Sequence, residues 1–335
     1  MGMKNESGHY LASALTGRGF LSYWPELFKK LERLYLFQGN TPMGQSLVIR
    51  LLGLALADRG LLVNYFHRAE DPMVLEGLIV SSRAFGVLSF DHPCANKEFF
   101  PSHLEVVVAE LPGGNLPGDN RVLNYDKIEQ LLQSARIIHN SYCSGYSAQL
   151  DTGFMEKAAG WVEEFQERES GLNHYFAGGI NALGEMNFLD HLLTGCRKCY
   201  LIRGFPVTGA MVMQEILVQA LSRCYSVDVF HSWIEPADRV ALLFPKIRVA
   251  VVDTTCCYQD FSSLPVDIIW DLTGDTRPAN FQKAGRKLQE IKSYLAEAVR
   301  LLDVLRQDGI ESIDLPDEEI NKIISWVLKE EIETK

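Results

Sequence analysis

The chain has 335 residues, of which 47% are hydrophobic and 22% are charged, and its formal net charge is −11. This composition is typical of a globular protein and excludes an intrinsically disordered chain. The acidic balance excludes the broad basic surface that binds nucleic acid or docks on an anionic membrane. The chain has no run of about 18 apolar residues, and its N-terminal segment lacks the apolar core of a signal peptide, so we expect a cytoplasmic protein.

A glycine-rich segment follows the first clear strand signal. The run LYLFQ (34–38) is short and apolar, as in a buried strand. The segment GQSLVIRLLGLALADRG (44–60) has the apolar period of a helix, with Gly60 as its end. Where strand and helix join lies a candidate nucleotide-binding loop, formed by Gly39, Asn40, Thr41, Pro42, Met43, Gly44, Gln45 and Ser46.

The rest of the first half alternates strand and helix patterns. Three further apolar runs, LVNYFH (62–67), GVLSF (86–90) and LEVVVAE (104–110), predict strands, and residues 127–140 predict a helix. Strands separated by a helix imply right-handed crossovers and a largely parallel sheet. The loop LPGGNLPGDN (111–120) follows the last strand and is interpreted either as a lid or as a plain connection.

The second half of the sequence repeats the first. HYLASALTGRGF begins at His9 and HYFAGGINALGE begins 165 residues later, at His174. At the same offset YLFQGNTPMG (from Tyr35) falls on YLIRGFPVTG (from Tyr200) without a gap. An internal repeat of this length predicts two similar α/β domains in tandem.

The repeat fixes the expected domains and a second loop. Gly204 and Gly209 match Gly39 and Gly44, and Asp253 in IRVAVVDTT matches Asp91 in FGVLSFDHP. A long helical stretch, 280–307, closes the second half as 127–140 closes the first. We predict two domains, residues 1–165 and 166–335, each a mostly parallel sheet flanked by helices.

A strand, a Gly-x4-Gly loop and a helix form the setting of a phosphate-binding loop. Backbone N–H groups and the positive end of the helix dipole hold phosphate, a lysine reaches the terminal phosphates, and a Ser or Thr hydroxyl binds Mg²⁺. Here Ser46 has the place of that hydroxyl, and Asp91 follows a strand that would bring a second Mg²⁺ ligand. The lysine is replaced by Gln45.

The second loop departs further from the phosphate-binding pattern. Ala210 has the place of the lysine and Met211 the place of the hydroxyl, while Asp253 is kept. Two basic residues lie near the loops in sequence, Arg50 and Arg203. We interpret both as solvent-exposed or structural arginines, and the alternative is that one of them is a substitute cation. A cation from the other half of the chain or from a partner is a further alternative.

The paired segments, with a phosphate-type loop and a strand-ending Asp in each, resemble a family of tandem-repeat P-loop ATPase-like proteins of Firmicutes. The resemblance covers the chain from His9 to about Leu305. It implies a P-loop NTPase fold in each half and a nucleoside triphosphate with Mg²⁺ as the ancestral ligand. Typical members end each loop in Gly-Lys-Ser-Thr, so both loops of this chain are degenerate.

Two classes of function follow. The first is a degenerate P-loop protein with weak or absent hydrolysis, acting as a nucleotide-binding regulator or as a scaffold for a protein partner. The second is an active Mg²⁺-dependent ATPase or nucleotide kinase that uses the first loop with a cation supplied from elsewhere. The loss of the same charge from both loops favours the first, because charge stabilisation dominates phosphoryl transfer.

Cysteine and histidine residues suggest weaker alternatives. The pair Cys196 and Cys199 has the spacing of half a zinc site or of a redox pair, but no second pair matches it, which favours plain thiols. His9 and His174 begin the two repeats. We interpret them as side chains that attach these segments to the sheet, and the alternative is contact with nucleotide or with the other half.

Overall fold

The computed structural model describes residues 7–113, 122–144, 160, 171–205, 208–255, 266–273, 281–307 and 315–333. The chain folds into two compact units. Unit 1 contains residues 1–13, 22–124 and 303–335, and unit 2 contains residues 14–21 and 125–302. The halves 1–165 and 166–335 therefore describe the sequence repeat, whereas each compact unit also takes a segment from the other half. No helix in the described part of the chain is long and apolar enough to cross a membrane.

Unit 1 is built on a six-stranded sheet with the order β1-β5-β6-β7-β4-β8. Its strands are β1 (His9–Tyr10), β4 (Arg33–Gln38), β5 (Asn64–His67), β6 (Leu75–Val80), β7 (Phe85–Ser89) and β8 (Glu105–Glu110). Strand β4, next to the edge strand β8, pairs in parallel with both β7 and β8, and β1 pairs in parallel with β5. Strand β6, which the sequence patterns did not reveal, is antiparallel to both of its neighbours.

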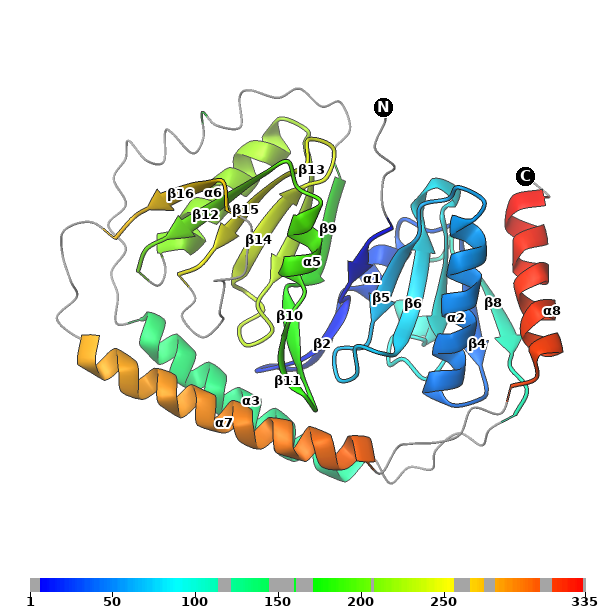
Figure 1. Cartoon of the computed structure of the whole chain (residues 1–335), viewed down its shortest axis with the longest axis horizontal. Helices are drawn as coiled ribbons and strands as arrows, with labels where there is room; N and C mark the ends of the chain where they lie inside the picture. Colours follow the sequence, from blue (N-terminus) through cyan, green and yellow to red (C-terminus); the bar gives the residue numbers. More distant parts are fainter. Residues whose placement is uncertain are drawn as a thin grey trace. The chain divides into compact units, whose positions relative to one another are not determined.

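Two helices cover one face of this sheet (Figure 1). Helix α2 (Pro42–Ala57) buries Val48, Ile49, Leu52 and Leu56 in the core. Helix α8 (Asp317–Leu328) has three acidic residues in its first turn and packs against the same core through Ile320, Val327 and Leu328. Each fully buried side chain of this size contributes about 1.5–3 kcal/mol. Short helices complete the unit: α1 (Trp24–Phe28), η1 (Ser81–Arg83), η2 (Lys97–Phe99) and the one-turn π-helix η5 (Lys329–Glu333).

The C-terminal segment is fixed by a buried ionic contact. Glu331 is fully buried, and its Oε1 accepts hydrogen bonds from Tyr35 Oη at 2.8 Å and from Arg33 Nη1 at 2.9 Å. The ring of Trp326 stacks edge-on against Tyr35, with centroids 5.4 Å apart. Strand β4 therefore holds the C-terminal helix by polar and aromatic contacts as well as by apolar burial.

Unit 2 contains a second six-stranded sheet with the order β16-β12-β15-β14-β13-β9. Its strands are β9 (Gly171–Phe176), β12 (Lys198–Arg203), β13 (Ser226–His231), β14 (Arg239–Phe244), β15 (Val249–Asp253) and β16 (Ile268–Asp271). The order and the mixture of parallel and antiparallel pairs are those of the first sheet. Helix α6 (Thr208–Ser222) packs on this sheet as α2 does on the first, and α5 (Leu189–Thr194) precedes β12.

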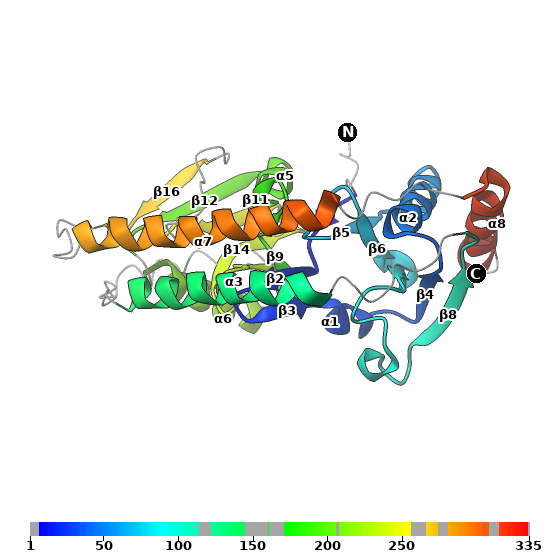
Figure 2. The ribbon, with the colours of Figure 1, turned by 90° about the horizontal axis from the view of Figure 1, so that it is seen from below.

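Two long helices lie side by side in unit 2, α3 (Val122–Cys143) and α7 (Phe281–Gln307) (Figure 2). Lys287 Nζ of α7 donates to Ser141 O of α3 at 2.7 Å. Each helix buries one stripe of residues spaced by three or four, which are Ile128, Leu132 and Ala135 in α3 and Ile291, Leu295, Ala298 and Leu302 in α7. Two β-hairpins also occur, β2 (Ser13–Thr16) with β3 (Gly19–Ser22), and β10 (Gly178–Asn181) with β11 (Gly184–Asn187).

The backbone confirms the repeat inferred from the sequence. The bulge between Phe66 and His67 recurs between Phe230 and His231. The left-handed residue Ala84 (φ 51°) corresponds to Arg248 (φ 58°). The two halves thus share fine backbone detail as well as strand order.

The buried contact of Glu331 predicts the cost of removing it. Replacing Glu331 by Ala leaves Arg33 and the Tyr35 hydroxyl without this acceptor, so we expect the free energy of unfolding to fall by about 2–3 kcal/mol. Urea denaturation measured by circular dichroism tests this. The matched control is Glu330→Ala, because Glu330 is half-exposed and lies 4.0 Å from Arg33; its effect should stay within about 0.5 kcal/mol. Equal losses in both variants would contradict the assignment.

Candidate functional site

The candidate loop of unit 1 follows β4 at the edge where three parallel strands end. Backbone hydrogen bonds continue beyond the strands, from Phe90 N to Phe37 O at 2.9 Å and from Leu111 N to Gln38 O at 2.7 Å. Ligands of open α/β sheets bind at this carboxyl edge. The loop therefore has the position that the sequence predicted for it.

The chain reverses sharply at Gly39 and Asn40. Gly39 has φ 90°, and a Cβ atom there would lie 2.5 Å from Leu111 O, so only glycine fits. Asn40 also has a left-handed backbone, with φ 59°, a conformation that asparagine tolerates better than most residues. The turn is thus built by two residues whose types suit it.

The Asn40 side chain fills the space inside the turn. Its Oδ1 accepts from Thr41 N at 2.8 Å, and its Nδ2 donates to Pro112 O at 2.8 Å. A Cβ atom on Gly44 would overlap the amide of Asn40 and approach Leu315 Cδ1 to 3.1 Å. Asn40 therefore lies directly against Gly44, where a phosphate-binding loop keeps open space for its ligand.

The N-terminus of α2 is capped by the protein itself. The helix begins at Pro42, and Thr41 Oγ1 accepts from Gly44 N at 3.1 Å. Gln45 N bonds to Thr41 O at 2.9 Å. The N–H groups that would bind phosphate in such a loop are in this way used by Asn40 and Thr41.

Gln45 presents an acceptor where the motif has a lysine. The side chain is fully buried, and its Nε2 donates to Gly39 O at 3.1 Å. A carbonyl oxygen can only accept, so this bond fixes which end of the amide faces Gly39. Gln45 Oε1 is left buried with no hydrogen-bond partner among the described residues. The position thus carries an oxygen lone pair in place of a positive charge.

The two expected Mg²⁺ ligands have other partners. Ser46 Oγ accepts from Leu75 N at 2.8 Å, which ties α2 to β6. Asp91 Oδ2 forms an ion pair with Arg68 at 2.9 Å. In the described part of the chain, no group of three or more His, Cys, Asp or Glu residues could hold a metal ion. Both side chains are therefore engaged by other groups of the chain.

Strand register changes one correspondence between the halves. Phe37 of β4 pairs with Ser89, and Ile202 of β12, 165 residues later, pairs with Asp253. Asp253 therefore corresponds in space to Ser89, and the sequence match of Asp253 with Asp91 was displaced by two residues. Ser89 is fully buried, and its Oγ has no hydrogen-bond partner within the described part.

In unit 2 a carboxylate lies against the helix that follows the loop. A Cβ atom on Gly209 would overlap the Asp253 carboxylate, and a Cβ on Gly204 would lie 2.5 Å from Thr208 Oγ1. Burial raises the pKa of Asp253 to about 6, although Thr255 N donates to its Oδ1 at 2.8 Å and favours the charged form. Above pH 6 the Asp253 carboxylate is mostly ionised, and its negative charge next to Gly209 opposes the binding of phosphate.

The basic residues near the loops also have partners. Arg50 Nη2 donates to Met73 O at 3.0 Å, and Arg203 Nη1 lies 3.9 Å from Asp271 Oδ2. These contacts direct both side chains to groups outside the glycine-rich loops. Most of the predicted lid, residues 114–120, lies outside the described residues.

The two histidines that begin the repeats are joined to the sheet in the same way. His9 Nδ1 lies 2.8 Å from His67 Nε2, and His174 Nδ1 lies 2.9 Å from His231 Nε2. His231 Nδ1 lies 2.8 Å from Pro236 O, so it donates there and leaves Nε2 as an acceptor. The structure thus confirms the interpretation that these histidines attach the first strand of each repeat to the sheet.

The paired cysteines are poor thiolates. Burial raises the pKa of Cys196 to about 11 and that of Cys199 to about 12. Metal ligation and redox exchange both need the deprotonated sulfur. These directions support the interpretation of plain thiols.

Sequence reasoning missed a buried polar cluster in unit 1. Ser13 Oγ lies 2.9 Å from His92 Nε2 and 3.1 Å from Glu76 Oε1, and Trp24 Nε1 donates to the same Glu76 oxygen at 2.8 Å. All four side chains are buried. Their wide separation in sequence gave no local signal.

Comparison with known proteins gives no match. No family model matches the chain, and no curated protein or solved structure is similar to it.

The raised pKa of Asp253 predicts a pH dependence. A buried acid whose pKa is about 6, above the ordinary value of 3.8, favours the folded state when it is neutral. The stability of unit 2 should therefore fall as the pH rises from about 4 to about 6, by up to about 3 kcal/mol. Asp253→Asn should remove this dependence, so that its stabilising effect appears above pH 6 and vanishes near pH 4. Denaturation at several pH values measures it.

Asp271 provides the control, because it is exposed and also ends a strand of the same sheet, β16. Asp271→Asn should retain the pH dependence of the natural protein. A pH profile that Asp253→Asn leaves unchanged would show that Asp253 ionises normally.

Proposed function

We propose that the chain is a tandem P-loop NTPase-like protein whose loops no longer support nucleotide hydrolysis, and that it acts as an interaction scaffold or regulatory partner. The proposal is supported by the positions of the two loops in their sheets. Each unit has a strand next to the sheet edge, a loop with two glycines and a following helix at the same place in a sheet of the same order. The resemblance to tandem-repeat P-loop ATPase-like proteins belongs to this proposal.

The orientation of Gln45 carries the proposal. Its Nε2 bond to Gly39 O leaves a lone pair of Oε1 where a lysine would place a positive charge. A charge-assisted contact to phosphate contributes about 1.5–3 kcal/mol, so its loss weakens binding by roughly one to two orders of magnitude. Asn40, which fills the turn, adds a steric barrier. Phosphoryl transfer should suffer more than binding, because it depends on charge stabilisation.

The second loop supports the same function by a different route. It has Ala210 in place of the lysine and Met211, 41% exposed, in place of the hydroxyl. The buried Asp253 adds a negative charge next to Gly209. Neither loop therefore offers the positive surroundings that a triphosphate needs.

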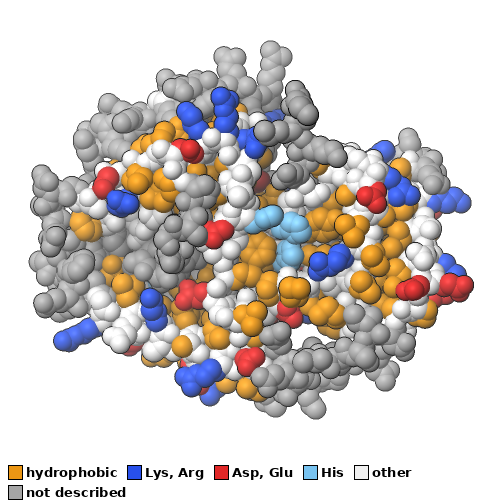
Figure 3. Space-filling model, viewed as in Figure 1, with side chains coloured by type: hydrophobic (Ala, Val, Ile, Leu, Met, Phe, Trp, Pro, Cys, Tyr) orange, Lys and Arg blue, Asp and Glu red, His pale blue; other side chains and the backbone are white. Residues whose placement is uncertain are grey.

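An interaction role is supported by apolar side chains on the surface. Figure 3 shows such side chains gathered on one face of unit 1, in the region of α2 and β6. Leu54 is 53% exposed and Met73 is 65% exposed. Exposed apolar groups of this kind are typical of surfaces that contact other proteins.

Calorimetric titration of ATP and GTP into the full chain, with and without Mg²⁺, tests the proposal. We expect no Mg²⁺-dependent binding at micromolar concentrations, because the loop is filled and uncharged. Gln45→Lys alone should not restore binding, since Asn40 still fills the turn. The double variant Asn40→Gly with Gln45→Lys should bind at least tenfold more tightly than Gln45→Lys, because it removes the obstruction and adds the charge.

The contrary outcome is equally specific. Micromolar, Mg²⁺-dependent binding by the natural chain that Ser46→Ala abolishes would overturn the proposal in favour of an active Mg²⁺-dependent ATPase or nucleotide kinase. Circular dichroism and urea denaturation of each variant establish that a lost signal does not come from unfolding.

A further inference from the structure

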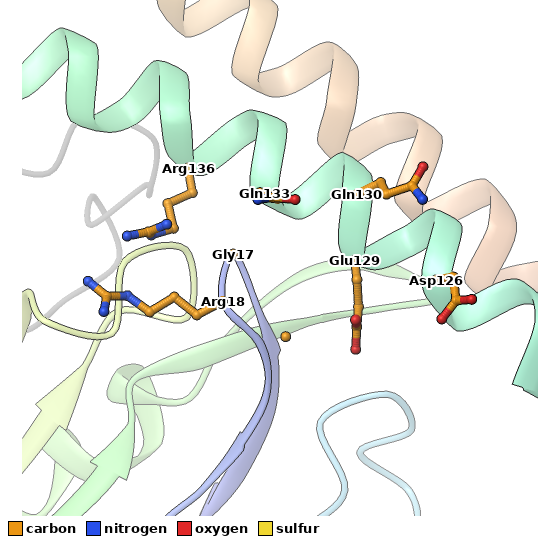
Figure 4. A pocket seen from close by; sticks show the side chains of 8 residues that line it. Gly17, Arg18, Asp126, Glu129, Gln130, Gln133 and Arg136 are labelled. Atoms are coloured by element: carbon orange, nitrogen blue, oxygen red, sulfur yellow. The ribbon is translucent and has the colours of Figure 1, made fainter.

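Unit 2 contains a polar cavity of about 500 Å³ between the tip of the β2–β3 hairpin and helix α3 (Figure 4). Sites for small ligands and short peptide segments have volumes of roughly 300–1,000 Å³. The hairpin contributes Gly17, Arg18 and Gly19, and α3 contributes one face from Asp126 to Arg136. None of these residues takes part in either glycine-rich loop.

The hairpin tip is held close to α3. A Cβ atom on Gly17 would lie 2.5 Å from Arg136 Cβ and 2.6 Å from Ile234 O. A residue with a side chain would push the hairpin away from the helix. The absence of a side chain at Gly17 therefore sets the width of the cavity.

One end of the cavity has two arginines held by a buried carboxylate. Arg18 Nε donates to Glu235 Oε1 at 2.9 Å, and Arg136 Nε donates to Glu235 Oε2 at 2.6 Å. Burial opposes the ionisation of Glu235, but the hydrogen bonds of Asn140 and the two arginines hold its pKa below the ordinary range. Two guanidinium groups thus share one carboxylate, which leaves one positive charge in excess.

This positive end has free hydrogen-bond donors. Among the described residues, Arg18 Nη1 and both Nη nitrogens of Arg136 have no hydrogen-bond partner. Because Glu235 already fixes the two side chains, an incoming carboxylate would lose little further side-chain entropy on binding them. The arrangement suits a carboxylate in the way that paired arginines generally do.

The opposite end is acidic. Asp126 and Glu129 lie three residues apart on α3, on the side of the cavity away from the arginines (Figure 4). Gln130 and Gln133 also line the cavity and offer amide donors and acceptors, and Gln133 lies between the two ends (Figure 4). From Asp126 to Arg136 the helix rises about 15 Å, at 1.5 Å for each residue. An extended peptide of four to five residues has about the same length.

We propose that this cavity binds a short extended peptide segment of a partner protein, with an acidic side chain at Arg18 and Arg136 and a basic side chain at Asp126 and Glu129. The proposal rests on the interaction role proposed above and names the chemistry of the partner. The glutamine amides pair with the peptide backbone between the two charges. The acidic end disfavours polyphosphates and other purely anionic ligands.

The test uses capped peptides, in which only the side chains carry charge, and the full chain labelled for heteronuclear NMR. The probe is Ac-KGSGE-NH2, and Ac-EGSGE-NH2 is its charge-changed counterpart. We expect saturable binding of the first, with a dissociation constant on the order of 1 mM, and at least tenfold weaker binding of the second. Shifts should appear at residues of α3 and of the hairpin tip.

Charge reversal gives a gain of function that unfolding cannot imitate. Asp126→Lys with Glu129→Lys should lose the first peptide and bind the second, because both ends of the cavity are then basic. Gln133→Trp should abolish both interactions by filling the cavity. Replacing either arginine is avoided, because it would leave Glu235 buried without its partner.

The matched control changes the net charge equally at two residues that do not line the cavity. Asp58 and Glu290 are exposed, and Asp58→Lys with Glu290→Lys should leave the preference for the first peptide unchanged. Loss of that preference in the control, or absence of saturable binding by the natural chain, overturns the proposal. Failure of the peptide to bind leaves the result of the nucleotide titration untouched, so the two proposals can fail separately.

Discussion

The parallel pairing of β4 with both of its neighbours is the constraint on which the first loop depends. Three strands end at one edge, and the chains leaving β7 and β8 continue to bond to the end of β4. Leu111 O then occupies the space beside Gly39 and forces a left-handed turn. In unit 2 the same bonds run from Thr254 N to Ile202 O and from Leu272 N to Arg203 O. Strand pairing thus directs the chain into each loop in the same way, whatever side chains the loop carries.

The equivalent tyrosines of β4 and β12 have aromatic partners on different elements. Tyr35 stacks against Trp326 of the C-terminal helix, whereas Tyr200 stacks against Trp270 of the edge strand β16, with centroids 5.0 Å apart. By register, Trp270 corresponds to the smaller Ala109 of β8. A larger residue on the edge strand supplies in unit 2 the aromatic contact that α8 supplies in unit 1. The repeat therefore keeps the contact while changing the segment that provides it.

Much of the architecture could be predicted from the sequence, because the repeat supplied each pattern twice. The strands that contain Tyr35 and Tyr200, the helices after the loops and the long helices all appear where periodicity placed them. Strand β6 and its counterpart β14 were missed: Glu76 and Gly77 interrupt the apolar run of β6, whereas the run VALLF of β14 is as apolar as those of the strands that were found. Their antiparallel direction depends on tertiary pairing, which local pattern does not encode.

Side-chain contacts in the loops were less accessible to sequence reasoning. The loss of the lysine at Gln45 was visible, but its bond to Gly39 O depends on the turn geometry. Asp91 was matched with Asp253 because the residues around them are similar in sequence. The strand register shows instead that Ser89 is the residue of unit 1 that corresponds to Asp253. A shift of two residues keeps the direction of alternate side chains, so the apolar pattern could not reveal the error.

The polar groups near the two loops predict that the loops differ in their sensitivity to pH. In unit 1 the loop is filled by neutral amides, and its unpaired atoms, Gln45 Oε1 and Ser89 Oγ, do not titrate near neutral pH. Each unsatisfied atom costs about 1–3 kcal/mol of folding free energy at every pH. In unit 2 the group at the position of Ser89 is the carboxyl of Asp253, which ionises near pH 6 against a helix that lacks the lysine to balance it. The unpaired atoms beside the first loop thus carry a cost that does not depend on pH, whereas the cost of burying Asp253 beside the second depends on its protonation.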